Sequence, residues 1–176
     1  VFTTHFPDEE RPAGRPLRTT PCYDRLKEMG AVFGQKFGWE RANWFAPKGI
    51  KQEDHWSFRR SDWFHHVGNE VANVTENVGV LDMSAFGKCR LSGPGAEAFL
   101  EHMIANKLPK NKGRIILAHS LSIGGGVHSE FTIMKEKEDS FYLVSAGAAQ
   151  RLDHDWLKKQ MPSDGTVQFT DLTNSR

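Results

Sequence analysis

A carboxylate that follows three glycines is the part of this sequence whose residues best suit chemistry. Gly124 to Gly126 lead directly into Val127-His128-Ser129-Glu130, a pattern that indicates a hairpin turn followed by a strand. Because glycines add no side-chain bulk, a ligand could approach the Glu130 carboxylate closely. The same spacing also fits a solvated glutamate beside an ordinary turn, and the sequence by itself leaves both interpretations open.

Other residue patterns give less support to other chemistries. The glycines match neither the Walker spacing nor GxGxxG, so nucleotide binding is not predicted. His65 and His66 are adjacent, but neighbours on a helix point about 100° apart and no HExxH motif follows, so no metal site is predicted. The aromatic residues between positions 39 and 64 are interpreted as a docking core between two domains, because no basic stripe accompanies them.

The composition excludes several classes of protein. With 38% hydrophobic and 26% charged residues, the chain is typical of globular proteins. Its 23 basic and 22 acidic residues nearly cancel, so we expect neither nucleic acid nor a membrane surface as a partner. Cys22 and Cys89 lie in no CxxC motif and are expected to be free thiols in a reducing compartment. No apolar stretch is long enough for a membrane helix and no signal segment opens the chain, which favours the cytoplasm or an organelle matrix.

The elements that would position Glu130 follow from the spacing of apolar residues. Alternation predicts strands at 79–84, 88–92, 115–121, 127–134, 140–145 and 167–172, the three from 115 to 145 forming a meander. Spacings of three and four predict helices at 62–78, 96–104 and 148–160, and a short one from Tyr23 that Gly30 or Gly34 would stop. We expect Leu152, Trp156 and Leu157 on the inner face of the helix at 148–160.

These elements predict an α+β fold, with an antiparallel or mixed sheet and helices packed on one face. Residues 1–21 are rich in proline, glycine, arginine and aspartate, and are expected to form an arm or linker that attaches to something else. Residues 38–47 contain more aromatic side chains than an exposed loop, so we expect them to be buried. The chain stops directly after a predicted strand, which indicates truncation.

Several runs of residues resemble a known family of enzymes. Those in the first part of the chain are Arg15 to Leu26, Gly30 to Gly34, Gly38 to Arg41 and Asn43 to Phe45. They resemble the junction between the flavin and folate domains of dimethylglycine and sarcosine dehydrogenases. The later runs are Val78 to Ser84, Phe86 to Lys88, Leu91 to Ala96, Gly113-Arg114 and Gly125 to Thr132. They resemble the opening of a glycine-cleavage T-protein-like, aminomethyltransferase domain.

The resemblance implies roles for particular residues. Glu130 falls where the family has an acidic residue that contacts the folate and helps the methylene transfer, often as aspartate. Tyr142 falls at a folate-contacting tyrosine, and Phe86 and Leu117 fall at apolar positions that line the pocket, so Glu130 is expected to be buried among these three. Ala146 stands where stand-alone T-proteins tend to have asparagine, and one polar contact is therefore missing.

The resemblance also implies a function and an organisation. Residues 1–60 would be a linker and the junction with a flavin domain, and residues 61–176 the N-terminal part of a T-protein-like folate-binding fold. The one-carbon unit of an N-methyl amine, oxidised to an iminium, would be captured on tetrahydrofolate as 5,10-methylenetetrahydrofolate. FAD would be bound by the parent enzyme and not by this segment, in the bacterial cytoplasm or the mitochondrial matrix. The alternatives are a non-catalytic binding or scaffolding module and a stand-alone aminomethyltransferase of the glycine cleavage system.

Overall fold

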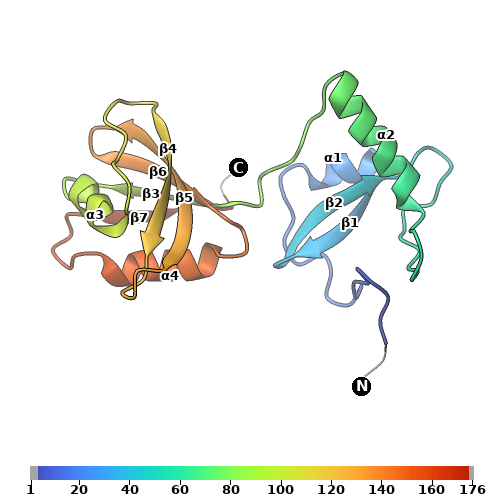
Figure 1. The fold of residues 1–176 in the computed structure, drawn as a ribbon, viewed down its shortest axis with the longest axis horizontal. Coiled ribbons are helices and arrows are strands. Elements are labelled where there is room, and N and C mark those ends of the chain that lie inside the picture. The colour runs from blue at the N-terminus through green and yellow to red at the C-terminus, as the bar shows by residue number, and fades with distance from the viewer. Residues whose placement is uncertain (1–3, 175–176) are drawn as a thin grey trace. The chain divides into compact units, whose positions relative to one another are not determined.

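The computed structural model describes residues 4–174 and consists of two compact units, Val1–Ser84 and Ala85–Arg176 (Figure 1). The boundary expected between residues 60 and 61 lies inside the first unit. It therefore separates no compact bodies, and the assignment of residues 1–60 to a junction stays a prediction.

The first unit is built on a two-stranded antiparallel hairpin. Its elements are α1 (Tyr23–Glu28), β1 (Ala31–Lys36), β2 (Trp39–Phe45) and α2 (Trp63–Glu76). Helix α1 is short because Gly30 adopts φ 99°, where a β-carbon would lie 2.5 Å from the carbonyl oxygen of Ala46. The burial expected for residues 38–47 is confirmed, since Trp39 and Trp44 on β2 are only 4% and 2% exposed.

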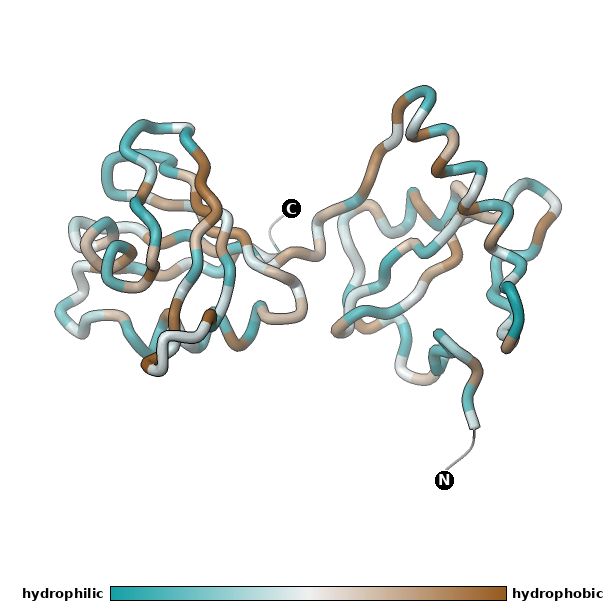
Figure 2. The backbone as a smooth tube through the Cα atoms, viewed as in Figure 1, coloured by the Kyte–Doolittle hydropathy of each residue, from teal (hydrophilic) through white to brown (hydrophobic). Residues whose placement is uncertain are grey.

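Helix α2 matches the predicted helix, but its apolar stripe is only partly covered. Trp63 and Val67 pack against the core formed by Val32, Trp44 and Ala46, whereas Val71 and Val74 are each 60% exposed. The two-stranded hairpin reaches only the first turns of the helix. The strand predicted at 79–84 is wrong, because no other segment of residues 4–174 pairs with it and Val80 is fully exposed. In Figure 2 this apolar segment follows α2 in brown.

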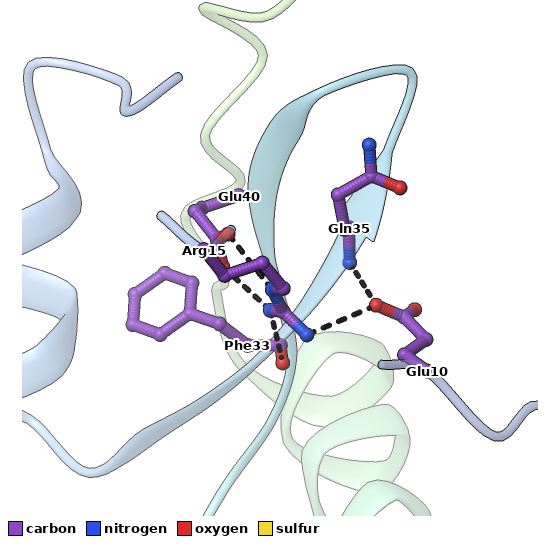
Figure 3. Close-up of polar contacts among 5 residues, drawn as sticks. All are labelled: Glu10, Arg15, Phe33, Gln35 and Glu40. Carbon is purple, nitrogen blue, oxygen red and sulfur yellow. Dashed lines mark hydrogen bonds and ion pairs between the residues drawn. The ribbon is translucent and has the colours of Figure 1, made fainter. Parts of the chain in front are cut away.

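The segment before α1 is anchored to the hairpin of its own unit (Figure 3). Arg15 donates from Nε and Nη2 to the carboxylate of Glu40, at 2.9 and 2.6 Å, and from Nη2 to the carbonyl of Phe33. Glu10 accepts hydrogen bonds from Arg15 Nη1 and from the backbone N–H of Gln35. The arm expected at residues 1–21 therefore binds, over its described part, to strands β1 and β2.

The second unit is a five-stranded antiparallel sheet with strand order β4-β5-β6-β3-β7. Its strands are β3 (Gly87–Ser92), β4 (Ile115–Leu121), β5 (Val127–Lys137), β6 (Ser140–Ser145) and β7 (Gln168–Asp171), and its helices are α3 (Ala96–Met103) and α4 (Gln150–Gln160). The predicted meander from 115 to 145 is confirmed as β4-β5-β6. The α+β class and the antiparallel sheet are confirmed as well.

Alternating residues of this sheet form one core with both helices. The inward-facing side chains include Cys89, Leu91, Ala118, Phe131, Ile133, Phe141 and Leu143. Helix α3 adds Phe99 and Leu100, and α4 adds Leu157 with Trp156 packed at its edge. The inward position expected for Leu152 is wrong, since this residue is 59% exposed. The buried side of α4 runs through Asp153, His154 and Leu157, and its centre lies about 150° around the helix from Leu152.

Candidate functional site on the outer face of the sheet

The side of the five-stranded sheet that faces away from α3 and α4 carries the candidate site, and we call it the outer face. Successive side chains of a strand point to opposite faces, so the residues between the core positions share this side. The outer face consists of Ile115, Leu117, His119, Glu130, Thr132, Met134, Glu136, Tyr142, Val144, Lys88, Arg90 and Thr170. Ile115 and Leu117 are 60% and 54% exposed. Such an uncovered apolar surface is typical of a binding face.

Glu130 lies on β5 directly opposite His119 of β4. His119 Nε2 is 3.0 Å from Oε2 of Glu130, and the Glu130 side chain is 55% exposed. The burial expected for Glu130 is therefore not found in the part of the chain that the structure describes. The carboxylate is available to a ligand and is held by one polar partner.

The sheet register places the four predicted site residues at three levels of the second unit. Continuing the pairing of Thr132 with Val144, and of Gly87 with Ser145, puts Phe86 and Ala146 at the level of Glu130. Leu117 pairs with Thr132 at the next level, and Tyr142 pairs with Met134 at the one after. Glu130 and Tyr142 are therefore about 13 Å apart along the strands, at about 3.3 Å per residue. Only an elongated ligand could contact both.

Tyr142 belongs to a polar cluster at its end of the face. Arg90 makes a bidentate pair with Glu136, donating from Nε at 2.6 Å and from Nη2 at 2.9 Å, and Ser140 donates to the same carboxylate. These contacts lower the pKa of Glu136. Partial burial and the nearby Glu136 charge raise the pKa of Tyr142. The phenol is therefore protonated at neutral pH and can donate a hydrogen bond.

Two hollows of the described structure are lined by residues other than Glu130. One, of about 640 Å³, lies beside the polar cluster and is lined by Arg90, Ser92, Glu136, Lys137, Glu138, Asp139 and Ser140. Another, of about 450 Å³, lies in the first unit, where Trp44, Trp56 and Trp63 line it with Asp54 and Glu10. Neither of these two hollows includes Glu130, whose carboxylate is exposed on the outer face.

No group of three or more histidine, cysteine, aspartate or glutamate side chains within residues 4–174 could hold a metal ion. No helix in the same range is long and apolar enough to span a membrane.

His119 is the residue of this site that the sequence alone did not single out. Its partnership with Glu130 depends on the β4–β5 register, which shifts between Ser120 and Leu121. If the pairs are counted outward from the glycine turn without this shift, His119 is not paired with Glu130. Ile115, Leu117 and His119 lie two residues apart along the predicted strand, and this spacing was the available signal that their side chains share one face.

Comparison with known proteins gives both a family and a fold. The family model of the GCVT N-terminal domain matches residues 22–176. The human mitochondrial dimethylglycine dehydrogenase is 34% identical over 171 residues, which are 96% of this chain and 20% of that protein. The mouse mitochondrial pyruvate dehydrogenase phosphatase regulatory subunit is 33% identical over 178 residues, 98% of this chain and 20% of that protein.

The crystal structure of glycine cleavage system aminomethyltransferase T from Bartonella henselae superposes with a TM-score of 0.68. It is 19% identical, and the match covers 89% of this chain and 38% of that one, which shows a shared fold. The chain spans about a fifth of the length of the curated relatives it matches.

Proposed function

Because the chain belongs to the family of GCVT N-terminal domains, we propose that its outer face is one wall of a tetrahydrofolate site used in one-carbon transfer. The observation that carries this proposal is the placement of Glu130, Leu117 and Tyr142 on one uncovered sheet face. These residues come from three strands and are brought to the same side only by the registers of the sheet.

The residues of the outer face suit a folate in shape and in chemistry. A pterin joined to an aminobenzoyl group is flat and elongated, and it would lie along the strands between the level of Glu130 and that of Tyr142. Leu117, Met134 and Val144 offer apolar contacts to the rings, since they lie between these levels or beside them. The facing wall would come from the remaining length of the polypeptide, as the relatives are about five times longer than the match.

Each end of the face has its own chemical task in this proposal. Bound tetrahydrofolate would supply the nitrogens that accept the one-carbon unit of the iminium, giving 5,10-methylenetetrahydrofolate and releasing the demethylated amine. Glu130 accepts the proton that the attacking nitrogen loses, or stabilises the positive charge that develops beside it. Tyr142 donates from its protonated hydroxyl and orients the ligand. Ala146, at the level of Glu130, makes no side-chain hydrogen bond there.

The source of the one-carbon unit is inferred from the relatives. The human relative is a dimethylglycine dehydrogenase by name, so we propose an N-methyl amine, dimethylglycine or sarcosine, as the donor through its iminium. Its oxidation requires a flavin, which a separate domain of the same polypeptide would bind. Both relatives compared above are mitochondrial, and the mitochondrial matrix is the proposed location, with the cytoplasm as its bacterial counterpart.

A second function has one specific observation in its favour. The mouse relative that matches 98% of this chain is named a regulatory subunit and not an enzyme. The same outer face could then bind a ligand without turning it over. This alternative predicts folate binding with no product formed.

The experiment that separates these functions measures product formation by the longest natural polypeptide that contains this sequence. With dimethylglycine and tetrahydrofolate, the wild type should form methylenetetrahydrofolate. Glu130→Gln should lower that rate about a hundredfold, as expected for loss of a general base. Oxidation of the amine should continue and release formaldehyde, which a trapping reagent removes before it condenses with tetrahydrofolate in solution. Glu138→Gln, an exposed glutamate in the β5–β6 turn, is the matched control. An unchanged rate for Glu130→Gln would rule out its proposed role.

A further inference from the structure

The partner of Glu130 gives an inference that deepens the proposed function and rests on it. We propose that His119 is a positioning residue for Glu130, holding carboxylate oxygen Oε2 so that Oε1 stays open to the ligand on the outer face. The contact that supports this is the 3.0 Å separation between Nε2 of His119 and Oε2 of Glu130. An ionised carboxylate only accepts hydrogen bonds, so Nε2 must carry the hydrogen.

The backbone around His119 explains why these two side chains meet. His119 donates its backbone N–H to Oδ1 of Asn106 at 2.9 Å, and its carbonyl accepts from the N–H of Ala105 at 2.8 Å. Both backbone groups are thus directed away from β5 and toward the loop that follows α3. The facing pair with Glu130 is therefore the non-hydrogen-bonded kind, in which the Cα atoms are only about 4.5 Å apart and the side chains come closest.

The same contacts hold the backbone of His119 in place at the edge of the sheet. Strand β4 is the edge of the sheet, and an edge residue without neighbours could move freely. Here the loop residues Ala105 and Asn106 cover that edge at His119. The His119 side chain is 39% exposed, compared with 55% for Glu130. The imidazole thus supports the carboxylate from one side and leaves its other side accessible.

The first test is a double-mutant cycle on ligand binding, with folinic acid (5-formyltetrahydrofolate) as the probe and calorimetry as the readout. In the longest natural polypeptide that contains this sequence, His119→Phe should weaken binding about three- to tenfold, the effect of losing one partly exposed hydrogen bond to a charged group. His119→Gln keeps a donor at a similar reach and should restore most of the affinity. In a Glu130→Gln background, His119→Phe should have little further effect. His102→Phe, an exposed histidine on α3, is the matched control.

The second test reads the pair directly, without ligand. Long-range nitrogen NMR of the imidazole should show the Nε2–H tautomer of His119 in the wild type and a loss of that preference in Glu130→Gln. Additive effects of His119→Phe and Glu130→Gln, or a failure of His119→Gln to restore affinity, would overturn the inference. If the wild type does not bind folinic acid, the proposed function fails. The tautomer measurement then still decides whether His119 holds Glu130.

Discussion

At the scale of single residues, the outer face contains two polar ends with different electrostatics. Near Glu130, one histidine supports an exposed carboxylate. Near Tyr142, a pair of opposite charges surrounds a phenol, and partial burial together with the Glu136 charge raises the pKa of Tyr142. The two ends thus offer a ligand an acceptor at one level and a donor at another.

The effect of Glu136 on Tyr142 can be tested by substitution. Glu136→Gln should lower the pKa of Tyr142, because it removes the negative charge that opposes ionisation and leaves Arg90, whose charge favours the tyrosinate. The chain has two tyrosines, so a Tyr23→Phe background isolates the absorbance of the Tyr142 tyrosinate in a pH titration. Glu138→Gln in the same turn should leave the titration unchanged. A Tyr142 pKa that stays fixed or rises in Glu136→Gln would contradict this electrostatic account.

At the scale of elements, the hairpin of the first unit depends on a charge cluster that joins it to the chain before α1. The Glu40 side chain is 3% exposed and the Arg15 side chain 20% exposed, and they share two hydrogen bonds. Removing only one member would leave a nearly buried charge without its partner, which is more destabilising than removing both.

This asymmetry gives a prediction for stability. Arg15→Met should destabilise the first unit by about 2–3 kcal/mol, less than the roughly 3–5 kcal/mol of a fully buried pair because Arg15 is partly solvated. The double variant Arg15→Met/Glu40→Met should lie within about 1 kcal/mol of the wild type. Urea unfolding followed by tryptophan fluorescence reports mainly on this unit, since Trp156 alone of the tryptophans lies in the other. A double variant as unstable as the single one would show that packing, and not charge pairing, holds the segment.

The sequence predicts a strand correctly where another strand of the chain lies beside it and accepts its hydrogen bonds. The alternation at 115–121, 127–134 and 140–145 predicted real strands, because short turns bring each strand next to its neighbour. The alternation at 79–84 was just as clear, yet these residues form no strand. Alternating residues can share one face, but a strand also needs a neighbouring strand for its backbone hydrogen bonds. The apolar stripe of α2 predicted the helix correctly but its burial only in part. The width of the stripe does not show how much of the helix the β1–β2 hairpin can cover.

The sequence predicts single residues of the site, but not the strand registers that bring them to one face. Sequence reasoning singled out Glu130 and Tyr142 separately, but their common face depends on an irregularity between Lys135 and Lys137. One extra residue in a strand reverses which side chains face outward. His119 was missed for the same reason, because its pairing with Glu130 depends on the shifted β4–β5 register.

At the scale of the whole molecule, the chain consists of two compact units joined near residue 84. Residues 78–83 form no helix or strand, and Val80 and Leu81 are 101% and 73% exposed. Exposed segments without regular structure are the first to be cut by proteases. Asp82 is tied down by hydrogen bonds from Thr20 and from the backbone of Ser84, so the accessible bonds lie just before it.

Limited proteolysis therefore tests this organisation. Brief chymotrypsin treatment should cut after Leu81 and separate the two units, whose fragments are identified by mass spectrometry. Leu81→Ser should slow that cut, while Leu152→Ser, at a leucine within helix α4 that is 59% exposed, should not. A first cut within β4, β5 or β6 would contradict the assignment of residues 85–176 to one compact body.

Methyl NMR of the longest natural polypeptide that contains this sequence shows whether the outer face binds a folate. On titration with folinic acid, the methyl signals of Leu117, Met134 and Val144 on the outer face should shift with a common affinity. The methyl signals of Ile133 and Leu143 on the opposite side of the same sheet should move far less, because the sheet itself separates them from the ligand. Shifts confined to the inner methyls or to the first unit, or no saturable shift on the outer face, would contradict the account.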